Sequence, residues 1–582
     1  MRLINVKAIL DIQGGLHFDS ETEVLVELNE NSAYAILSHC WGAPKEEMQF
    51  KEMEGLARMD AATREKILKR SGYQKILGSC IQARKDQLDW VWADTCCINK
   101  ESSSELSEAI NSMFRWYNKS RQCYVYLHDV DDSTFPIERD DDRFTKFNGR
   151  PKWFSRGWTL QELVSPSIVH FFNQKWKLIG DKKSLATTLR DITFIPTNVL
   201  ADGISTNRPS VAQIMSWAAD RKTTREEDQA YSLLGLLGVH MPMLYGEGKN
   251  AFRRLQEEII RRSNDQSIFA WGHTWRNGWS TSLLADHPSC FRDCYNIVKV
   301  EPDDYEDILR TDIPEEELSE ISDKRLRTFN ITNAGIQIWL PLLKCVGDAP
   351  LFRAKLACRR SDSWAPVSIY LVSFGSNYSR YFGQFETPFN VKFNLHRVFL
   401  PYPDDADHGN FTFEMDLRTL ASDGFSRCCV YPDDLDMSNN FVTLSNINDC
   451  AIVVFNHAQS HTGFAVILHY CFGQHLVNAS YCEASGKWNE EAQALFPLVR
   501  KECLEEAFRR TRARQHAGIK HIHQPRSIHG VRLTYEGLLE SRDRCTVTID
   551  ITQCTGCCGP NWRRLDDVSI FAEQVRQADC HP

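Results

Sequence analysis

Short, nearly continuous apolar runs alternate with amphipathic segments in the first third of the chain. The runs are rich in β-branched and aromatic residues and lie at 34–38, 90–94, 123–127 and 168–172. Each is too short for a helix, and an uninterrupted apolar run is typical of a strand whose two faces are both covered in a parallel sheet. The alternation of strand and helix patterns predicts an α/β domain over residues 1–180.

Two amphipathic helices are predicted between these strands. Apolar residues recur at helical spacing over 73–81 and again over 106–117, and the second stripe follows a capping box formed by Ser102 and Glu105. We expect a parallel sheet with helices on both faces, ordered as in flavodoxin-like folds. The run at 90–94 is expected to be a central strand, because so apolar a segment needs cover on both faces.

Residue composition and the spacing of apolar residues divide the remainder of the chain into four segments. Helical stripes predict an annex over residues 181–275, and an acidic segment poor in aromatic residues predicts a linker over 276–327. Short alternating runs separated by Gly, Asn, Asp and Pro predict an antiparallel β-rich domain over 328–500. We expect a helix and a cysteine-containing tail over 501–582.

Composition excludes several classes of protein. The chain has 582 residues, of which 42% are hydrophobic and 25% charged, as in a chain that buries a core. Its 77 acidic residues outnumber its 68 basic ones, and a net charge of −9 argues against nucleic acid as a partner. No segment has the roughly 18 consecutive apolar residues that a membrane helix needs, and the amino end lacks a secretory leader pattern. We expect a cytoplasmic protein that does not associate with membranes.

Cysteines and acidic residues do not predict a metal site. The 20 cysteines are roughly 3% of the chain, too few for a disulfide scaffold, so we expect mostly reduced, buried thiols. Cys554, Cys557 and Cys558 lack the paired spacing of a zinc ribbon, and the acidic segment 129–142 lacks the glycine and spacing of an EF-hand. The phosphate-binding motif of P-loop NTPases is absent from the sequence.

The ends of the predicted strands carry the residues that suit a ligand site. Ligands of open parallel sheets bind beyond the carboxyl ends of the strands. Polar and aromatic residues follow the first strand at 38–42, follow the second at 94–97, and precede the fourth at 153–162. The candidate residues in these segments are Ser38, His39, Trp41, Gly42, Asp94, Ser155, Arg156, Trp158 and Glu162.

These three segments resemble the signature blocks of the heterokaryon-incompatibility (HET) domain of filamentous fungi. The resemblance covers residues 33–42, 90–98 and 153–162, and segments at 215–218, 223–228 and 243–248 resemble the annex that often follows that domain. One departure is Asn99-Lys100, where many family members have an acidic or amide residue followed by Gln. The resemblance implies a role in non-self recognition and cell death, with self-association or a protein partner for activation.

The HET domain is in turn similar to TIR domains, several of which cleave NAD at the nicotinamide–ribose bond with one glutamate. NAD or a related nucleotide is then a substrate, and no bound cofactor is implied. The TIR-type motif places an aromatic residue four positions before the glutamate and a serine upstream, which here are Trp158, Glu162 and Ser155. Nicotinamide leaves as a neutral molecule, so one carboxylate is sufficient to stabilise the ribosyl cation. A tryptophan offers a stacking face, and Arg156 or the amides that begin the helix suit a phosphate.

Structural alternatives remain open for each of these residues. Thr159 and Glu162 also have the spacing of a capping box, and Asp94 is either a ribose partner or a helix cap. Ser38 and His39 fit a turn with a satisfied imidazole, and Trp41 and Trp158 fit a core role. The competing function is a non-enzymatic signalling module that assembles through a TIR-like surface.

Overall fold

The computed structural model of the chain contains two compact units. The first comprises residues 1–345 and 351–402, and the second comprises 346–350 and 403–582. The structure describes residues 1–15, 22–29, 31–145, 148–272, 278–280, 283–319, 328–346, 351–374, 377–382, 387–388, 391–402, 411–433, 435, 440–444, 450–457, 463–471, 474–482, 487–496, 517–523, 529–537 and 544–553.

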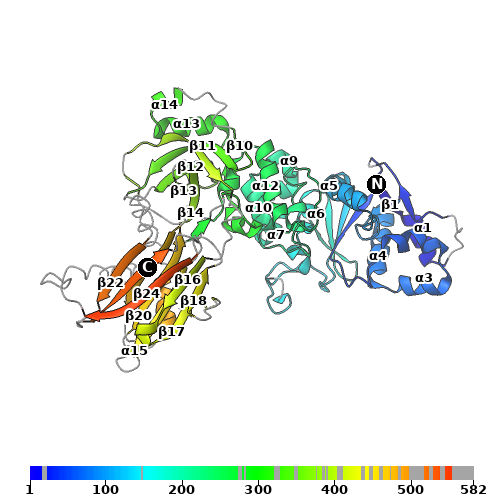
Figure 1. The fold of residues 1–582 in the computed structure, drawn as a ribbon. Coiled ribbons are helices and arrows are strands. Elements are labelled where there is room, and N and C mark those ends of the chain that lie inside the picture. Colours follow the sequence, from blue (N-terminus) through cyan, green and yellow to red (C-terminus); the bar gives the residue numbers. More distant parts are fainter. Residues whose placement is uncertain are drawn as a thin grey trace. The chain divides into compact units, whose positions relative to one another are not determined.

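A mixed sheet forms the amino-terminal part of the first unit (Figure 1). Its strands are β1 (Arg2–Asn5), β2 (Leu25–Glu27), β3 (Ala35–His39), β4 (Trp90–Trp92), β5 (Gln122–Tyr126), β6 (Val169–Phe172) and β7 (Leu178–Asp181). They lie in the order β2-β1-β4-β3-β5-β6-β7. Strands β4, β3, β5 and β6 are parallel neighbours, whereas β1, β2 and β7 add at the two sides in antiparallel pairs.

The parallel centre of this sheet confirms the expected α/β architecture. Strand β4 lies between β1 and β3, as its apolar sequence predicts, and the side chains of Val91 and Trp92 are fully buried. Every residue of β3 is buried as well. The four parallel strands have the spatial order second, first, third, fourth, which is the beginning of the order found in flavodoxin-like sheets.

Helices cover the sheet in two groups (Figure 1). The first group is α1 (Val6–Gln13), α2 (Phe50–Gly55), η1 (Leu56–Arg58), α3 (Ala61–Leu68) and α4 (Ser71–Lys85), and the second is α5 (Ser103–Lys119), η3 (Lys152–Ser155) and α6 (Thr159–Val164). Helices α4 and α5 confirm the two predicted amphipathic stripes, although Ile81 is exposed. Half of the predicted capping box is present: the Ser102 hydroxyl accepts from the amide of Glu105, but the Glu105 carboxylate accepts from the amide of Asn99 instead.

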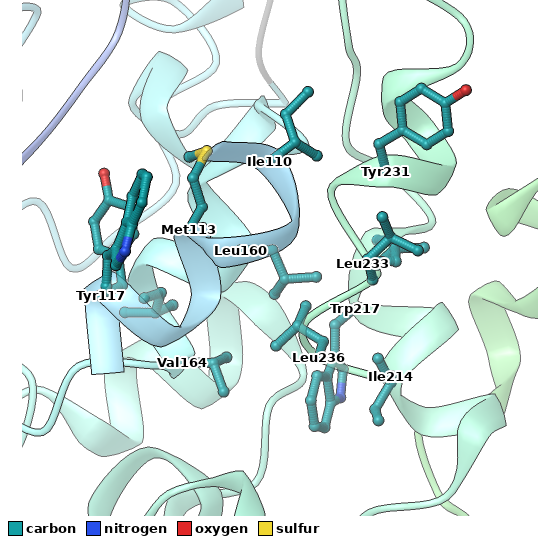
Figure 2. Packing of buried hydrophobic residues seen from close by; sticks show 14 of the residues in the cluster. Ile110, Met113, Tyr117, Leu160, Val164, Ile214, Trp217, Tyr231, Leu233 and Leu236 are labelled. Atoms are coloured by element: carbon teal, nitrogen blue, oxygen red, sulfur yellow. The ribbon is translucent and has the colours of Figure 1, made fainter. Parts of the chain in front are cut away.

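The predicted annex is helical and packs directly on the sheet domain. Its helices are α7 (Ala186–Thr193), α8 (Thr197–Asp202), α9 (Ile204–Asn207), α10 (Val211–Ala218), α11 (Asp228–Tyr231), α12 (Asn250–Arg262) and η4 (Gln266–Phe269). Figure 2 shows Ile214 and Trp217 of α10 on the annex side and Leu160 and Val164 of α6 on the sheet side of one buried cluster. A Cβ on Gly235 would lie 2.1 Å from the Cβ of Phe114 in α5. The annex and the sheet domain therefore share one hydrophobic core.

A strand-rich region completes the first unit. It contains β8 (Gly278–Ser280), η5 (Pro288–Cys294), β9 (Ile297–Lys299), α13 (Pro302–Asp312), α14 (Glu315–Ser319), β10 (Asn330–Ile331), β11 (Gly335–Lys344), β12 (Leu351–Arg360), β13 (Pro366–Phe374), β14 (Asn377–Phe382) and β15 (Asn394–Pro401). The order β11-β15-β14-β13-β12 returns to β11 through a β11–β12 pairing, so these strands close into a barrel-like sheet.

The expected linker at 276–327 contains ordered elements in its described part. Tyr305, Leu309 and Ile313 recur at i, i+4, i+8 along and just beyond α13, and all three are buried against the barrel-like sheet. Several acidic residues that suggested a linker, Asp303, Asp304, Glu306 and Asp307, lie on the same helix, because an amphipathic helix can carry a charged face beside an apolar stripe.

The second unit is a β-sandwich. Its elements are β16 (Phe411–Asp416), α15 (Arg418–Ser422), β17 (Phe425–Tyr431), β18 (Phe441–Leu444), β19 (Cys450–His457), β20 (Gly463–Cys471), β21 (Gln474–Cys482), β22 (Ala517–His523), β23 (His529–Gly537) and β24 (Arg544–Gln553). One sheet has the order β18-β16-β24-β23-β22 and the other β17-β19-β20-β21, and a single core contains residues of both. The β-rich expectation is therefore correct in outline.

The carboxyl-terminal part differs from the expected helix and tail. Residues 517–523, 529–537 and 544–553 form strands, while the predicted helix after residue 501 and Cys554, Cys557 and Cys558 lie outside the described residues. In the described part, no helix has the length and apolar character that crossing a membrane requires. No His, Cys, Asp and Glu cluster suited to a metal ion occurs in that part either.

Candidate functional site

The carboxyl ends of β3 and β4 bring the first candidate residues together. Ser38 and His39 end β3, and Asp94 follows β4 by two residues. Because the two strands are parallel neighbours, these residues meet at one edge of the sheet. Helix α6 adds Glu162 at the same edge, as the following contacts show.

Ser38 and Glu162 are directly hydrogen-bonded. The Ser38 hydroxyl donates to Oε2 of Glu162 and accepts from Nε1 of Trp153 at 2.8 Å. Ser38 and Trp153 are fully buried, and Glu162 is 6% exposed. Trp153 lies within a predicted block, yet sequence reasoning did not select it. Its indole N–H fixes the serine hydroxyl so that the serine proton points to the carboxylate.

Glu162 is an acid with an unusual pKa. The pKa of this carboxyl is raised to about 8, mainly by burial and also by nearby Asp94, while the Ser38 hydrogen bond and the charges of Arg156 and Arg221 oppose the rise. Such a carboxyl is mostly protonated at neutral pH and ionises when a positive charge approaches. A strongly perturbed titratable group at a strand edge is typical of a functional site.

The capping-box interpretation of Glu162 is wrong. Helix α6 begins after Trp158, and no side chain caps its first turn. The Thr159 hydroxyl donates instead to the carbonyl oxygens of Trp153, at 2.6 Å, and Arg156, at 2.9 Å. The Glu162 carboxylate is thereby left to Ser38 rather than to a helix end.

A second polar group surrounds Asp94. Nε1 of Trp41 donates to Oδ2 of Asp94 at 2.8 Å, and Nε2 of His39 lies 3.3 Å from Oδ1. Burial alone would raise the pKa of Asp94, but the neighbouring His39 and Trp41 side chains and the charge of Lys100 hold it well below its usual range. Asp94 is therefore a stable anion beside a neutral Glu162, so the two carboxyl groups of the site have separate protonation states.

A buried ion pair between Lys75 and Glu47 contacts His39, which lies beside Asp94. Nζ of Lys75 on α4 bonds the Glu47 carboxylate, the carbonyl oxygen of Cys40 at 3.2 Å and Nδ1 of His39 at 3.1 Å. Since an ammonium can only donate, Nδ1 accepts, and the ring proton is assigned to Nε2, which faces Asp94. Glu47 also accepts from the amide of Gly42, so the loop 40–49 is tied to α4.

Three other candidates do not join this cluster. The Ser155 hydroxyl donates to the carbonyl of Lys152 at 2.7 Å, and the Gly42 amide is used by Glu47. The Trp158 indole lies near Asp228 of α11, where it opposes the rise in the pKa of that carboxyl that burial causes. The aromatic residue four positions before the glutamate therefore faces the annex.

The annex holds the segment that leads into α6. Nη1 of buried Arg221 donates to the carbonyl of Arg156 and to the Thr159 hydroxyl, both at 2.9 Å. The amide of Gly157 donates to the carbonyl of Lys222 at 2.9 Å, and the amide of Lys222 donates to the carbonyl of Ser155 at 2.7 Å. These bonds form a short parallel bridge between the two segments. Arg221 follows a helical stripe far along the chain, and no local pattern marks it for this contact.

Cysteines near the site are not poised as nucleophiles. Burial raises the pKa of Cys40 to about 12 and the pKa of Cys123 well above its usual range. Thiols of this kind remain protonated and unreactive at neutral pH. The candidates for acid–base chemistry at this edge of the sheet are therefore the carboxyl groups of Glu162 and Asp94.

The fold and the site together define an α/β domain with a buried carboxyl group at the carboxyl ends of its parallel strands. Residues 34–150 match the family model described as heterokaryon incompatibility protein (HET), and residues 250–385 match a domain of unknown function (DUF8212). The chain is also 47% identical over 228 residues to vegetative incompatibility protein HET-E-1 of Podospora anserina. The chain therefore contains a HET domain.

The extent of these matches is limited in two ways. The alignment with HET-E-1 covers 39% of this chain and 16% of the length of that relative. The HET match ends at residue 150, before Trp153 and Glu162. Among solved structures, a lectin of Xerocomus chrysenteron aligns with 25% of this chain and 98% of its own, with 8% identity and a TM-score of 0.19.

Proposed function

We propose that this chain is a HET-domain effector of non-self recognition and cell death that hydrolyses NAD at the nicotinamide–ribose bond through Glu162. The observation that carries the proposal is the buried Ser38–Glu162 hydrogen bond at the carboxyl edge of parallel strands. The similarity to a vegetative incompatibility protein supports the biological role. The resemblance of the HET domain to TIR domains supports the reaction.

The raised pKa of Glu162 suits a cationic substrate. With a pKa of about 8, Glu162 is mostly neutral at pH 7 before NAD binds, and the positive nicotinamide ring of NAD favours the carboxylate when it binds. The bond between the ribose C1′ and the pyridine nitrogen then breaks, and its electron pair leaves with neutral nicotinamide. The carboxylate stabilises the ribosyl cation until water adds to C1′ and releases a proton.

The neighbouring residues have supporting roles in this proposal. Ser38 orients Glu162, and Trp153 orients Ser38. Asp94, which stays ionised, is suited to accept from ribose hydroxyls. Activation by self-association or by a protein partner is part of the proposal.

Nicotinamide release from NAD tests the reaction. Purified chain is assayed dilute and at high concentration, alongside Glu162→Gln and the control Glu54→Gln, which changes an exposed carboxylate on α2. We expect Glu162→Gln to lower turnover about 100-fold, because the anion is lost while size is kept. Wild-type kcat/KM should rise as the pH approaches 8, because the active form carries ionised Glu162. Equal turnover in wild type and Glu162→Gln rules out the mechanism.

A non-enzymatic assembly module is the competing function. It is favoured by the low exposure of the Ser38–Glu162 pair, which is also suited to a structural hydrogen bond inside the domain. This function predicts no nicotinamide release at any protein concentration, together with self-association detectable by light scattering. Wild-type turnover that Glu162→Gln abolishes would exclude it.

A further inference from the structure

The Trp41 ring carries two cations at the edge of the candidate site. Nζ of Lys100 lies 3.7 Å from the ring centroid, and Cζ of Arg156 lies 5.9 Å from it. The indole is held by its bond to Asp94 and is 40% exposed. The three side chains come from the segments after β3, after β4 and before α6. The fold thus gathers two positive charges on one aromatic surface that solvent reaches.

Carboxylates act on these two cations through space: burial lowers the pKa of Lys100 and the charge of Asp94 opposes that shift, while the charge of Arg156 opposes the rise in the pKa of Glu162 that burial causes. Within the described residues, however, neither the ammonium of Lys100 nor the guanidinium of Arg156 makes a hydrogen bond or a salt bridge. The two carboxylates that follow Lys100 most closely in the sequence pair with other cations: Glu101 with Lys51 at 2.5 Å, and Glu105 with Arg2. Contact with an indole is worth about 1 kcal/mol at a partly exposed position, so these charges remain able to bind an anion.

The backbone under both cations is fixed before any ligand binds. The amide of Asn99 donates to Glu105 at 2.8 Å, and the Asn99 side chain accepts from the amide of Glu101 at 3.1 Å. These two bonds restrain the backbone on both sides of Lys100. The carbonyl of Arg156 is held by Arg221. Preorganised charges bind an anion with a smaller loss of conformational entropy.

We propose that Lys100 and Arg156, arranged on Trp41, bind the phosphate groups of the ligand that occupies the Glu162 site. The site then accepts a phosphorylated nucleotide and discriminates against the corresponding nucleoside. This inference rests on the proposed function for the identity of that ligand. The guanidinium of Arg156 suits two phosphate oxygens at once, and the ammonium of Lys100 supplies a point charge for the neighbouring phosphate.

Binding measurements test the inference without turnover. Isothermal titration calorimetry on the full chain compares ADP-ribose with adenosine, which lacks phosphate. We expect wild type to bind ADP-ribose at least 10-fold more tightly than adenosine, and Lys100→Gln or Arg156→Gln to weaken ADP-ribose about 10-fold without changing adenosine. Lys100→Arg should retain most of the affinity. Lys66→Gln, an exposed change on α3, is the matched control and should bind both ligands as wild type does.

Several results would overturn the inference. They are unchanged ADP-ribose affinity in Lys100→Gln with a wild-type melting temperature, equal wild-type affinities for the two ligands, or no ADP-ribose binding at millimolar concentration. Loss of ADP-ribose affinity in Lys100→Gln supports the anion site even where Glu162→Gln leaves nicotinamide release unchanged. That combination refutes the proposed reaction and retains the phosphate site, so the two failures are distinguishable.

Discussion

Replacing Glu162 by glutamine is expected to stabilise the fold, and to do so increasingly as the pH rises. Burial raises the pKa of this carboxyl from an ordinary value of 4.5 to about 8. Between those two pH values the folded chain keeps a proton that the unfolded chain has lost. The stability that the protonated group contributes is therefore fully present below pH 4.5 and is lost as the pH rises through 8.

The size of this effect follows from the width of the pH window. Each pH unit within it lowers the free energy of unfolding of the wild type by about 1.4 kcal/mol, so the loss is about 3 kcal/mol at neutral pH and about 5 kcal/mol above pH 8. Glutamine has no such titration, and its amide oxygen can still accept from Ser38. The difference in stability between Glu162→Gln and wild type should therefore grow from near zero at mildly acidic pH toward that upper value.

Urea unfolding followed by tryptophan fluorescence measures this difference at pH values from about 5 to 8.5. Comparing the two proteins at each pH cancels the titration of all other groups. Glu54→Gln, at an exposed position, should show no pH-dependent difference from wild type. A difference for Glu162→Gln that is constant with pH, or a wild type that is the more stable protein at pH 8, would refute the assignment of a buried neutral acid.

Two further predictions concern the packing that supports the site. Gly157→Ala places a Cβ 2.5 Å from Cγ2 of Thr223, so it should lower the free energy of unfolding by about 1–3 kcal/mol. Adding Thr223→Ser removes that methyl group and should restore part of the stability. A double variant no more stable than Gly157→Ala would contradict the contact. Lys75→Met leaves Glu47 buried without its cation and should cost about 3–5 kcal/mol in thermal or urea unfolding. The double change Lys75→Met with Glu47→Leu should recover most of that loss, and its failure to do so would argue against a dominant charge effect.

The sheet and the meeting of its strand ends were predictable because each depends on short-range pattern. Apolar runs such as 90–94 identify buried parallel strands, and parallel strands place Ser38 and Asp94 at one edge. Glu162 was selected through a family resemblance, and spacing alone favoured a helix cap that the structure does not contain.

The supports of the site were not predictable, because they depend on tertiary contacts. A lysine within an amphipathic stripe normally lies in solvent, yet Lys75 is buried against Glu47 from a loop far away in sequence. Arg221 acts on a segment about 65 residues earlier in the chain. Lys100 departs from the residue that many HET family members have at this position, so the sequence argued against a role for it. Only the fold shows that its ammonium lies on the Trp41 ring. The closure of the barrel-like sheet through β11 and β12 likewise has no local signature.

The bridge between the Ser155–Gly157 segment and Lys222 limits how this protein can be divided. The HET family match ends at residue 150, whereas Glu162 lies on a helix whose preceding segment, Ser155–Gly157, is hydrogen-bonded to the backbone of Lys222. The smallest part of this chain that retains the site is therefore larger than the segment that the HET family model matches. A recombinant exchange or fusion with a junction between residues 165 and 220 would transfer Glu162 without Arg221, which holds the segment before its helix.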